Sequence, residues 1–198
     1  MSTTRILAFA GSNRKASCNR KLIGAAAQLG TEAGLEVTLV DLNEYDLPIY
    51  NGDLEETSGL PANALALKKL IHAHDAVLIA SPEYNASVTP LLKNTIDWCS
   101  RPGGEDDPGK VWNGKLVGLL SASPGGLGGI RALNHLRAIL LNVSAFVIPA
   151  QFALSGAMQA FDEAGHLKEE AARKAVLSVL TQLSETAQAL TRHASNQS

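Results

Sequence analysis

The sequence predicts an α/β fold in which five parallel strands, in the order 2-1-3-4-5, carry helices on both faces. Apolar runs that do not alternate with polar residues are typical of strands buried on both sides. Five such runs occur, at Arg5–Ala10, Glu36–Leu42, Ala76–Ser81, Lys115–Ala122 and Ala145–Pro149. Segments with helical periodicity separate these runs, and a regular alternation of strand and helix is typical of a parallel sheet.

Each helical segment places mostly apolar residues on one face, at intervals of three or four positions. In chain order these faces contain Leu22, Ala26, Leu29 and Ala33; Leu60, Ala64, Leu67 and Ile71; Leu91, Leu92, Thr95, Ile96 and Cys99; Ile130, Leu133, Leu136, Leu140 and Val143; and Ala172, Val176, Val179, Leu183, Ala187 and Leu190 in a helix from about Lys168 to Thr191. Turn-forming residues predict long loops at Asn43–Gly59, Pro102–Gly114 and Gln151–Gly165. No linker divides the chain, so residues 1–198 are predicted to form one domain.

The composition restricts the functional classes. Of 198 residues, 45% are hydrophobic and 18% are charged, as in an ordinary soluble globular domain. The net charge of -2 and the absence of a basic face argue against nucleic acid, and no apolar segment is long enough for a membrane span. Cys18 and Cys99 have neither metal-ligand spacing nor a disulfide pattern, which predicts a cytoplasmic protein without a metal.

Three loops of small polar residues follow the first, third and fourth strands. In a doubly wound sheet, ligands bind outside the carboxyl ends of the strands, where the winding reverses. For the order 2-1-3-4-5 this point lies between the first and third strands, and the loop after the fourth strand is their neighbour. The sequence therefore predicts that the three loops surround one ligand site.

The first loop has the composition of a phosphate site. Ser12 and Ser17 carry hydroxyls, Asn19 an amide and Arg14 a positive charge, and the loop opens a helix whose N-terminus attracts anions. The alternative is that Ser17 or Asn19 only caps the helix. The loop is neither a Walker loop nor a Gly-x-Gly-x-x-Gly dinucleotide motif. Cys18 adjoins the loop, and its role is left open.

The other two loops suit a flat heterocycle. The third-strand loop, Pro82-Glu83-Tyr84-Asn85, can present backbone donors and acceptors to a ring edge. The fourth-strand loop contains Ser123, Gly125 and Gly126, and its glycines let the backbone approach a planar ligand closely. The alternatives are that Glu83 is a solvated charge, Tyr84 a half-buried surface aromatic and the glycine-rich segment a flexible turn.

These motifs resemble those of the NAD(P)H-dependent FMN reductases, a flavodoxin-like family that includes bacterial quinone, chromate and azo-dye reductases. The matching stretches are GSNRKASCN (11–19), SPEYNAS (81–87) with LKNTIDW (92–98), and SPGGLGGIR (123–131). The resemblance covers roughly Arg5 to Pro149, and the middle motif is the most specific. One departure is Val88-Thr89-Pro90, where many relatives have Pro-Gly.

The resemblance implies a three-layer flavodoxin-like sandwich with non-covalent FMN, NADPH or NADH as electron donor, a small-molecule acceptor, and a homodimer or homotetramer. It implies that the FMN phosphate binds Ser12, Arg14, Ser17 and Asn19, that the ring and ribityl chain meet Pro82, Glu83, Tyr84 and Asn85 largely through backbone, and that Ser123, Gly125 and Gly126 border the ring edge. No catalytic side chain is expected, because the flavin N5 carries the chemistry.

The same fold also serves two other functions. A flavodoxin-type electron carrier would bind FMN without turning over nicotinamide, but such carriers are usually strongly acidic and place aromatic residues around the flavin. This chain has a net charge of only -2 and 5% aromatic residues. A flavin-free binding module with the same fold would neither be purified with FMN nor rebind it.

Overall fold

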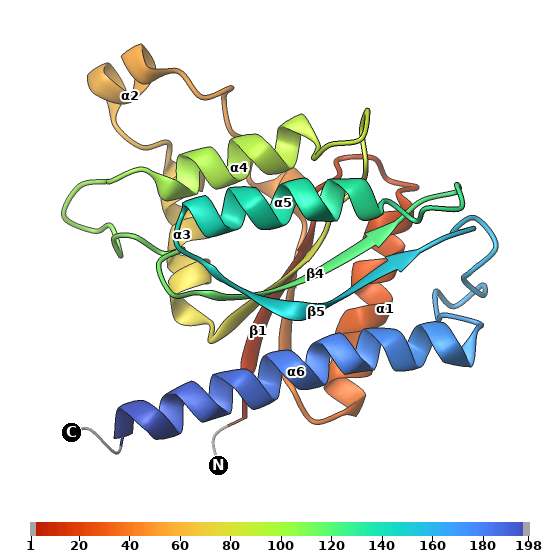
Figure 1. Ribbon diagram of the computed structural model, residues 1–198. Helices are drawn as coiled ribbons and strands as arrows, with labels where there is room; N and C mark the ends of the chain where they lie inside the picture. Colours follow the sequence, from red (N-terminus) through yellow and green to blue (C-terminus); the bar gives the residue numbers. More distant parts are fainter. Residues whose placement is uncertain (1–2, 196–198) are drawn as a thin grey trace.

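In the computed structural model, which describes residues 3–195, five parallel strands form one sheet in the order β2-β1-β3-β4-β5 (Figure 1). The strands are β1 (Arg5–Ala10), β2 (Glu36–Val40), β3 (Ala76–Ala80), β4 (Leu116–Ala122) and β5 (Phe146–Leu154). The predicted fold class and strand order are therefore confirmed. In the register of the ladders Ala10 pairs with Ala80, so the first and third strands end side by side.

Helices cover both faces of the sheet, and the first and last helices lie together on one of them (Figure 1). The helices are α1 (Cys18–Glu32), α2 (Gly52–Ser58), α3 (Ala62–Ala73), α4 (Pro90–Ser100), α5 (Ile130–Asn142) and α6 (Glu170–Ser195), with a short 3-10 turn, η1 (Leu42–Glu44). Helices α3, α4 and α5 cover the opposite face, and α2 projects from the body of the molecule. The fold is the expected three-layer sandwich.

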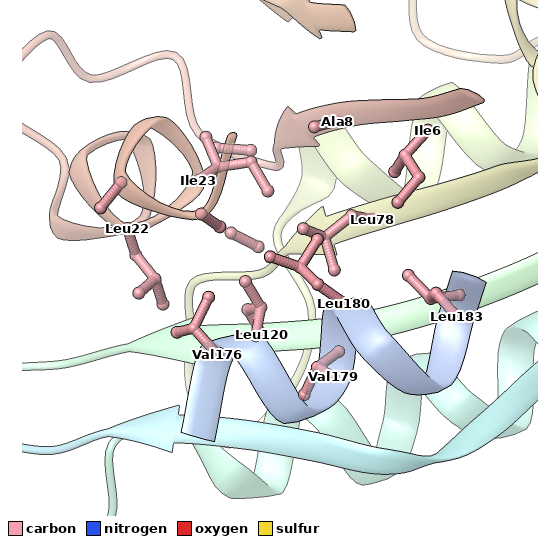
Figure 2. Close-up of a cluster of buried hydrophobic side chains, with 14 of the residues drawn as sticks. Ile6, Ala8, Leu22, Ile23, Leu78, Leu120, Val176, Val179, Leu180 and Leu183 are labelled. Atoms are coloured by element: carbon pink, nitrogen blue, oxygen red, sulfur yellow. The ribbon is translucent and has the colours of Figure 1, made fainter. Parts of the chain in front are cut away.

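Alternate residues of each strand face different cores. Figure 2 shows Ile6, Ala8 and Leu78 of the sheet packed against α1 and α6, where Val179 and Leu183 meet them. Their neighbours in the strands, such as Leu7 and Val77, belong to the second core beneath α3, α4 and α5. Burial of each large aliphatic side chain stabilises the fold by about 1.5–3 kcal/mol. Two such cores explain why the strands are apolar on both faces.

Strand β5 continues beyond the predicted end at Pro149. The ladder register shifts, so that Val117 pairs with Val147 but Leu119 pairs with Gln151. This bulge on an edge strand accommodates proline, which cannot donate to the ladder. Side chains satisfy the freed backbone groups: Arg137 donates to the carbonyls of Val147 and Ile148, and the amide of Ala150 donates to Gln182. The expected loop at Gln151–Gly165 therefore begins with strand residues.

The predicted loop at Asn43–Gly59 contains helix α2 and most of η1. None of the α2 residues is buried, so the segment lacks the apolar periodicity that identifies a helix from sequence. The predicted strand Glu36–Leu42 is also shorter, because Asp41 caps η1 by accepting from the Asn43 amide. The predicted loop at Pro102–Gly114 is held by a buried ion pair, in which the Lys68 ammonium lies 2.6 Å from the Asp107 carboxylate. No helix in the described part of the chain is long and apolar enough to cross a membrane.

Candidate functional site

The loops that follow β1, β3 and β4 meet in one cleft at the carboxyl edge of the sheet. The cleft is lined by Ser12, Arg14, Ser17, Cys18, Asn19, Pro82, Glu83, Tyr84, Ala122, Ser123 and Pro124. The structure thus brings together most of the residues proposed from the sequence. Three of them, Asn85, Gly125 and Gly126, belong to the same loops but do not line this cleft. Cys18, Ala122 and Pro124 line it in addition.

The first loop presents donors to the cleft. Ser17 caps α1, because its hydroxyl accepts from the Asn19 amide at 3.2 Å, and the Ser12 hydroxyl accepts from the Arg14 amide at 3.4 Å. Each hydroxyl keeps its own proton to donate to a ligand. Within residues 3–195, the backbone N–H groups of Lys15 and Ala16 have no acceptor. The loop therefore offers several donors at a helix N-terminus, as an anion requires.

Arg14 supplies the positive charge of the cleft. Its guanidinium donates to the Ala16 carbonyl at 3.2 Å, and no carboxylate of the described residues pairs with it. An arginine held over its own loop without a carboxylate is available to an anionic ligand.

The side chain of Asn19 bonds to the protein itself. It is 2% exposed, and its amide nitrogen donates to the Ala122 carbonyl at 2.8 Å while its oxygen accepts from the Ala122 amide at 2.9 Å. Both polar ends therefore bind the end of β4. Asn19 ties the first loop to the fourth strand, which no local pattern in the sequence indicates.

Thr89 makes a second tie between motifs. Its hydroxyl accepts from the Leu92 amide at 3.2 Å, which caps α4, and donates to the Gly11 carbonyl at 2.7 Å. A β-carbon at position 11 would lie 2.8 Å from the Leu92 β-carbon, so only glycine allows this close approach. The departure from the family pattern at Val88-Thr89-Pro90 thus supplies the helix cap and a contact to the first loop.

The third-strand loop ends in a two-residue turn. The amide of Tyr84 donates to the Ser87 carbonyl at 2.9 Å, and the Ser87 amide donates back to Tyr84 at 3.0 Å. The Tyr84 side chain is 48% exposed at the cleft. The Glu83 carboxylate points away from solvent and accepts from Arg131, whose guanidinium holds the pKa of this carboxyl below its usual value. Glu83 is therefore not the solvated charge that the sequence left open.

The glycine-rich loop is closed on its own strand. The Ser121 hydroxyl donates to the Gly128 carbonyl at 2.7 Å, and the Ser123 hydroxyl accepts from the Gly125 amide at 3.2 Å. At position 128, where φ is 61°, a β-carbon would lie 2.7 Å from backbone atoms of Ala153. A β-carbon at Gly126 would meet nothing within 4 Å. The loop is therefore fixed at its end and open at its tip.

A different cleft lies between α1 and the segment that leads into α6. It is lined by Ala25, Gln28, Leu29, Glu32, Asp162, His166, Leu167 and Arg173. Its charged groups have partners close by: Glu32 accepts from Gln28, Asp162 from His166, and Arg173 pairs with Glu170. No motif loop lines it. Within the described residues, no cluster of His, Cys, Asp or Glu could hold a metal ion.

Comparisons with known proteins agree with this geometry. The sequence model of the NADPH-dependent FMN reductase family matches residues 4–159. An NAD(P)H:quinone oxidoreductase of Solanum tuberosum is 38% identical over 184 residues, covering 90% of each chain. An NAD(P)H-dependent FMN reductase of Pseudomonas aeruginosa is 35% identical over 173 residues, covering 87% of this chain and 89% of its own.

A solved structure supports the same relationship. The flavoenzyme NAD(P)H:(acceptor) oxidoreductase FerB of Paracoccus denitrificans superposes with a TM-score of 0.80 at 29% identity, covering 94% of this chain and 98% of its own. The relatives are named for nicotinamide-dependent turnover. The comparisons therefore favour a reductase over an electron carrier.

Proposed function

The chain belongs to the NADPH-dependent FMN reductase family, and on this basis we propose that it transfers hydride equivalents from NADPH or NADH to a quinone or a similar small acceptor. It is an FMN-containing oxidoreductase, as its family match and its relatives' activities show. The observation that carries the proposal is the convergence of three ligand-type loops in one cleft. When bound, FMN supplies the two-electron chemistry.

The residues of the cleft fit the phosphate end of FMN. The cradle contains two hydroxyls, the backbone N–H groups of Lys15 and Ala16, which have no acceptor within residues 3–195, and the Arg14 guanidinium. We assign phosphate binding to Ser12, Arg14 and Ser17. Asn19 acts through its two bonds to Ala122, which hold the phosphate loop beside the glycine-rich loop. A loop held in this way presents its donors without reorganising when the ligand arrives.

The other two loops suit the ring and the ribityl chain. We assign these contacts to Pro82–Asn85, with Ser123, Gly125 and Gly126 along the ring edge. The support is the open space over Gly126, the exposed Tyr84 side chain and the backbone of the turn. Backbone N–H groups beside a reduced, anionic ring would stabilise its charge. The assignment needs no protein acid or base.

We also propose that the protein works in the cytoplasm as a homodimer or homotetramer. Both cysteines are free, as expected in a reducing compartment. The Ile49 side chain is 86% exposed, although neighbouring Pro48 accepts from Asn94 and Trp98 and so is fixed to α4. The family resemblance implies such an assembly, and Ile49 is an apolar side chain that a subunit contact would cover. Light scattering after size-exclusion chromatography measures the assembly, and a monomeric mass would contradict it.

The activity is tested with the FMN-loaded protein, by following aerobic oxidation of NADPH and of NADH with and without a benzoquinone. Quinone-stimulated oxidation is the expected result, and the ratio of the two rates identifies the donor. Bound FMN without nicotinamide oxidation would instead indicate an electron carrier. A protein that neither retains nor rebinds FMN would favour the flavin-free module.

The phosphate assignment is tested with Arg14→Ala. Loss of a charge-assisted contact of about 1.5–3 kcal/mol should raise the FMN dissociation constant roughly ten- to hundredfold. Lys21→Ala is the matched control, because it removes an exposed cation of α1 that has no side-chain partner among the described residues. Equal FMN affinity in the two variants would contradict the role of Arg14.

A further inference from the structure

The turn beside the cleft is strained. Asn85 and Ala86 both have positive φ, 50° and 64°, and the backbone bonds between Tyr84 and Ser87 close a two-residue hairpin around them. Such turns favour glycine where φ is positive, and Ala86 carries a β-carbon. A strained turn persists only when surrounding contacts determine its conformation.

Two anchors join this turn to α5, one on each side. Before the turn, the Glu83 carboxylate accepts from the backbone amide of Arg131 at 3.1 Å and from its side-chain Nε at 2.7 Å. After the turn, the Ser87 hydroxyl lies 3.0 Å from the His135 Nδ1. Arg131 and His135 are one helical turn apart, so a single helix fixes both ends of the hairpin.

Helix α5 in turn depends on Glu83. Its N-cap residue is Gly129, which makes no side-chain cap bond, and its first turn contains no acidic residue. The Glu83 carboxylate supplies the missing cap from another loop, and it also lies 3.4 Å from the Ala132 amide. An anion at a helix N-terminus is favoured by the helix dipole. The side chain is 9% exposed, so water competes little for these bonds.

We propose that Glu83 is a positioning residue, which caps α5 from the neighbouring loop and thereby fixes the Tyr84 turn against the glycine-rich loop. The two walls that receive the flavin ring are then preformed, since Gly129 ends one loop and Glu83 belongs to the other. The carboxylate also neutralises the Arg131 guanidinium beside the cleft. This inference rests on the proposed function, because it assigns a role toward FMN.

The experiment compares Glu83→Ala, Glu83→Gln and wild type in FMN affinity and in flavin midpoint potential. Loss of the cap should raise the FMN dissociation constant about tenfold in the alanine variant. Glutamine retains an acceptor for the α5 amides, so it should recover part of the affinity. Its midpoint potential should still be more positive than that of wild type, because the Arg131 guanidinium is no longer neutralised and its charge favours the reduced flavin anion. A purely structural role would not produce this shift.

Glu170→Gln is the matched control, because it removes an exposed carboxylate that pairs with Arg173 in the first turn of α6. If Glu83→Ala does not fold, Glu83→Gln decides alone through its midpoint potential. Wild-type affinity and potential in the folded Glu83 variants would overturn the inference. Failure of the wild-type protein to bind FMN would instead overturn the proposed function, so the two failures are distinguishable.

Discussion

Replacement of Asn19 by alanine separates two roles that this residue could have. The substitution removes both bonds to Ala122, at 2.8 and 2.9 Å, and leaves a buried backbone N–H and a buried carbonyl without partners. Each such group costs about 1–3 kcal/mol, so roughly 4 kcal/mol is lost in all. Alanine is better than asparagine inside a helix by about 0.6 kcal/mol. We therefore expect the free energy of unfolding to fall by about 3 kcal/mol.

The assay is denaturant unfolding of the apo protein, in which no FMN contact contributes. For a chain of this size, 3 kcal/mol corresponds to a fall in Tm of about 6–12 °C. Asn19→Asp should be similarly destabilised, because its carboxylate can accept from the Ala122 amide but repels the Ala122 carbonyl. The control Lys21→Ala should change the unfolding free energy by less than about 0.5 kcal/mol. An Asn19→Ala protein that loses under about 1 kcal/mol but binds FMN weakly would refute this reasoning and make Asn19 a direct ligand.

Three further outcomes are expected. Ala86→Gly should raise the unfolding free energy by about 0.5–1 kcal/mol in denaturant titrations, because the relief of left-handed strain exceeds the extra chain entropy that glycine loses on folding. A destabilised variant would contradict the inference that Ala86 is strained. A maleimide should alkylate Cys18 well before Cys99 in the native protein, as mass spectrometry can show, because burial raises the pKa of Cys99 to about 12. The pKa of Glu83 is lowered from 4.5, chiefly by its bond to Arg131, so the stability that this bond contributes is present above pH 4.5 and is lost as the pH falls through the lowered value. Over this pH range the unfolding free energy of Glu83→Gln should therefore fall less than that of wild type. Parallel profiles of unfolding free energy against pH would argue against the bond.

The fold could be predicted because burial on both faces leaves a simple trace in the sequence. Strands β1, β3 and β4 are continuous apolar runs, and their ends were predicted to within one residue. The errors have physical causes. Pro149 cannot donate to a sheet ladder, so it suggested a strand end. The strand continues through a bulge, where Arg137 bonds the backbone before Pro149 and Gln182 bonds the backbone after it. Helix α2 has no buried face and therefore no periodicity.

The position of the site was also predictable, because topology alone brings the carboxyl ends of β1, β3 and β4 together. The roles of individual side chains were less so. Asn19 and Glu83 both belong to ligand-type motifs, yet their side chains bind protein groups 103 and 48 residues away. A sequence shows that a residue is polar, but not whether its partner is a ligand or a distant backbone group.

Three side chains hold the loops of the cleft to neighbouring elements. Thr89 joins the α4 cap to the first loop, Asn19 joins the first loop to β4, and Glu83 joins the third-strand loop to α5. These side chains satisfy backbone groups that a ligand-free loop would otherwise leave to water, so the cleft keeps its shape before a ligand enters. Substitutions of Thr89, Asn19 or Glu83 should therefore change the stability of the apo protein and its FMN affinity together. Among the described residues, the Arg14 guanidinium bonds only to its own loop, so its substitution should change FMN affinity and leave the stability of the apo protein almost unaltered.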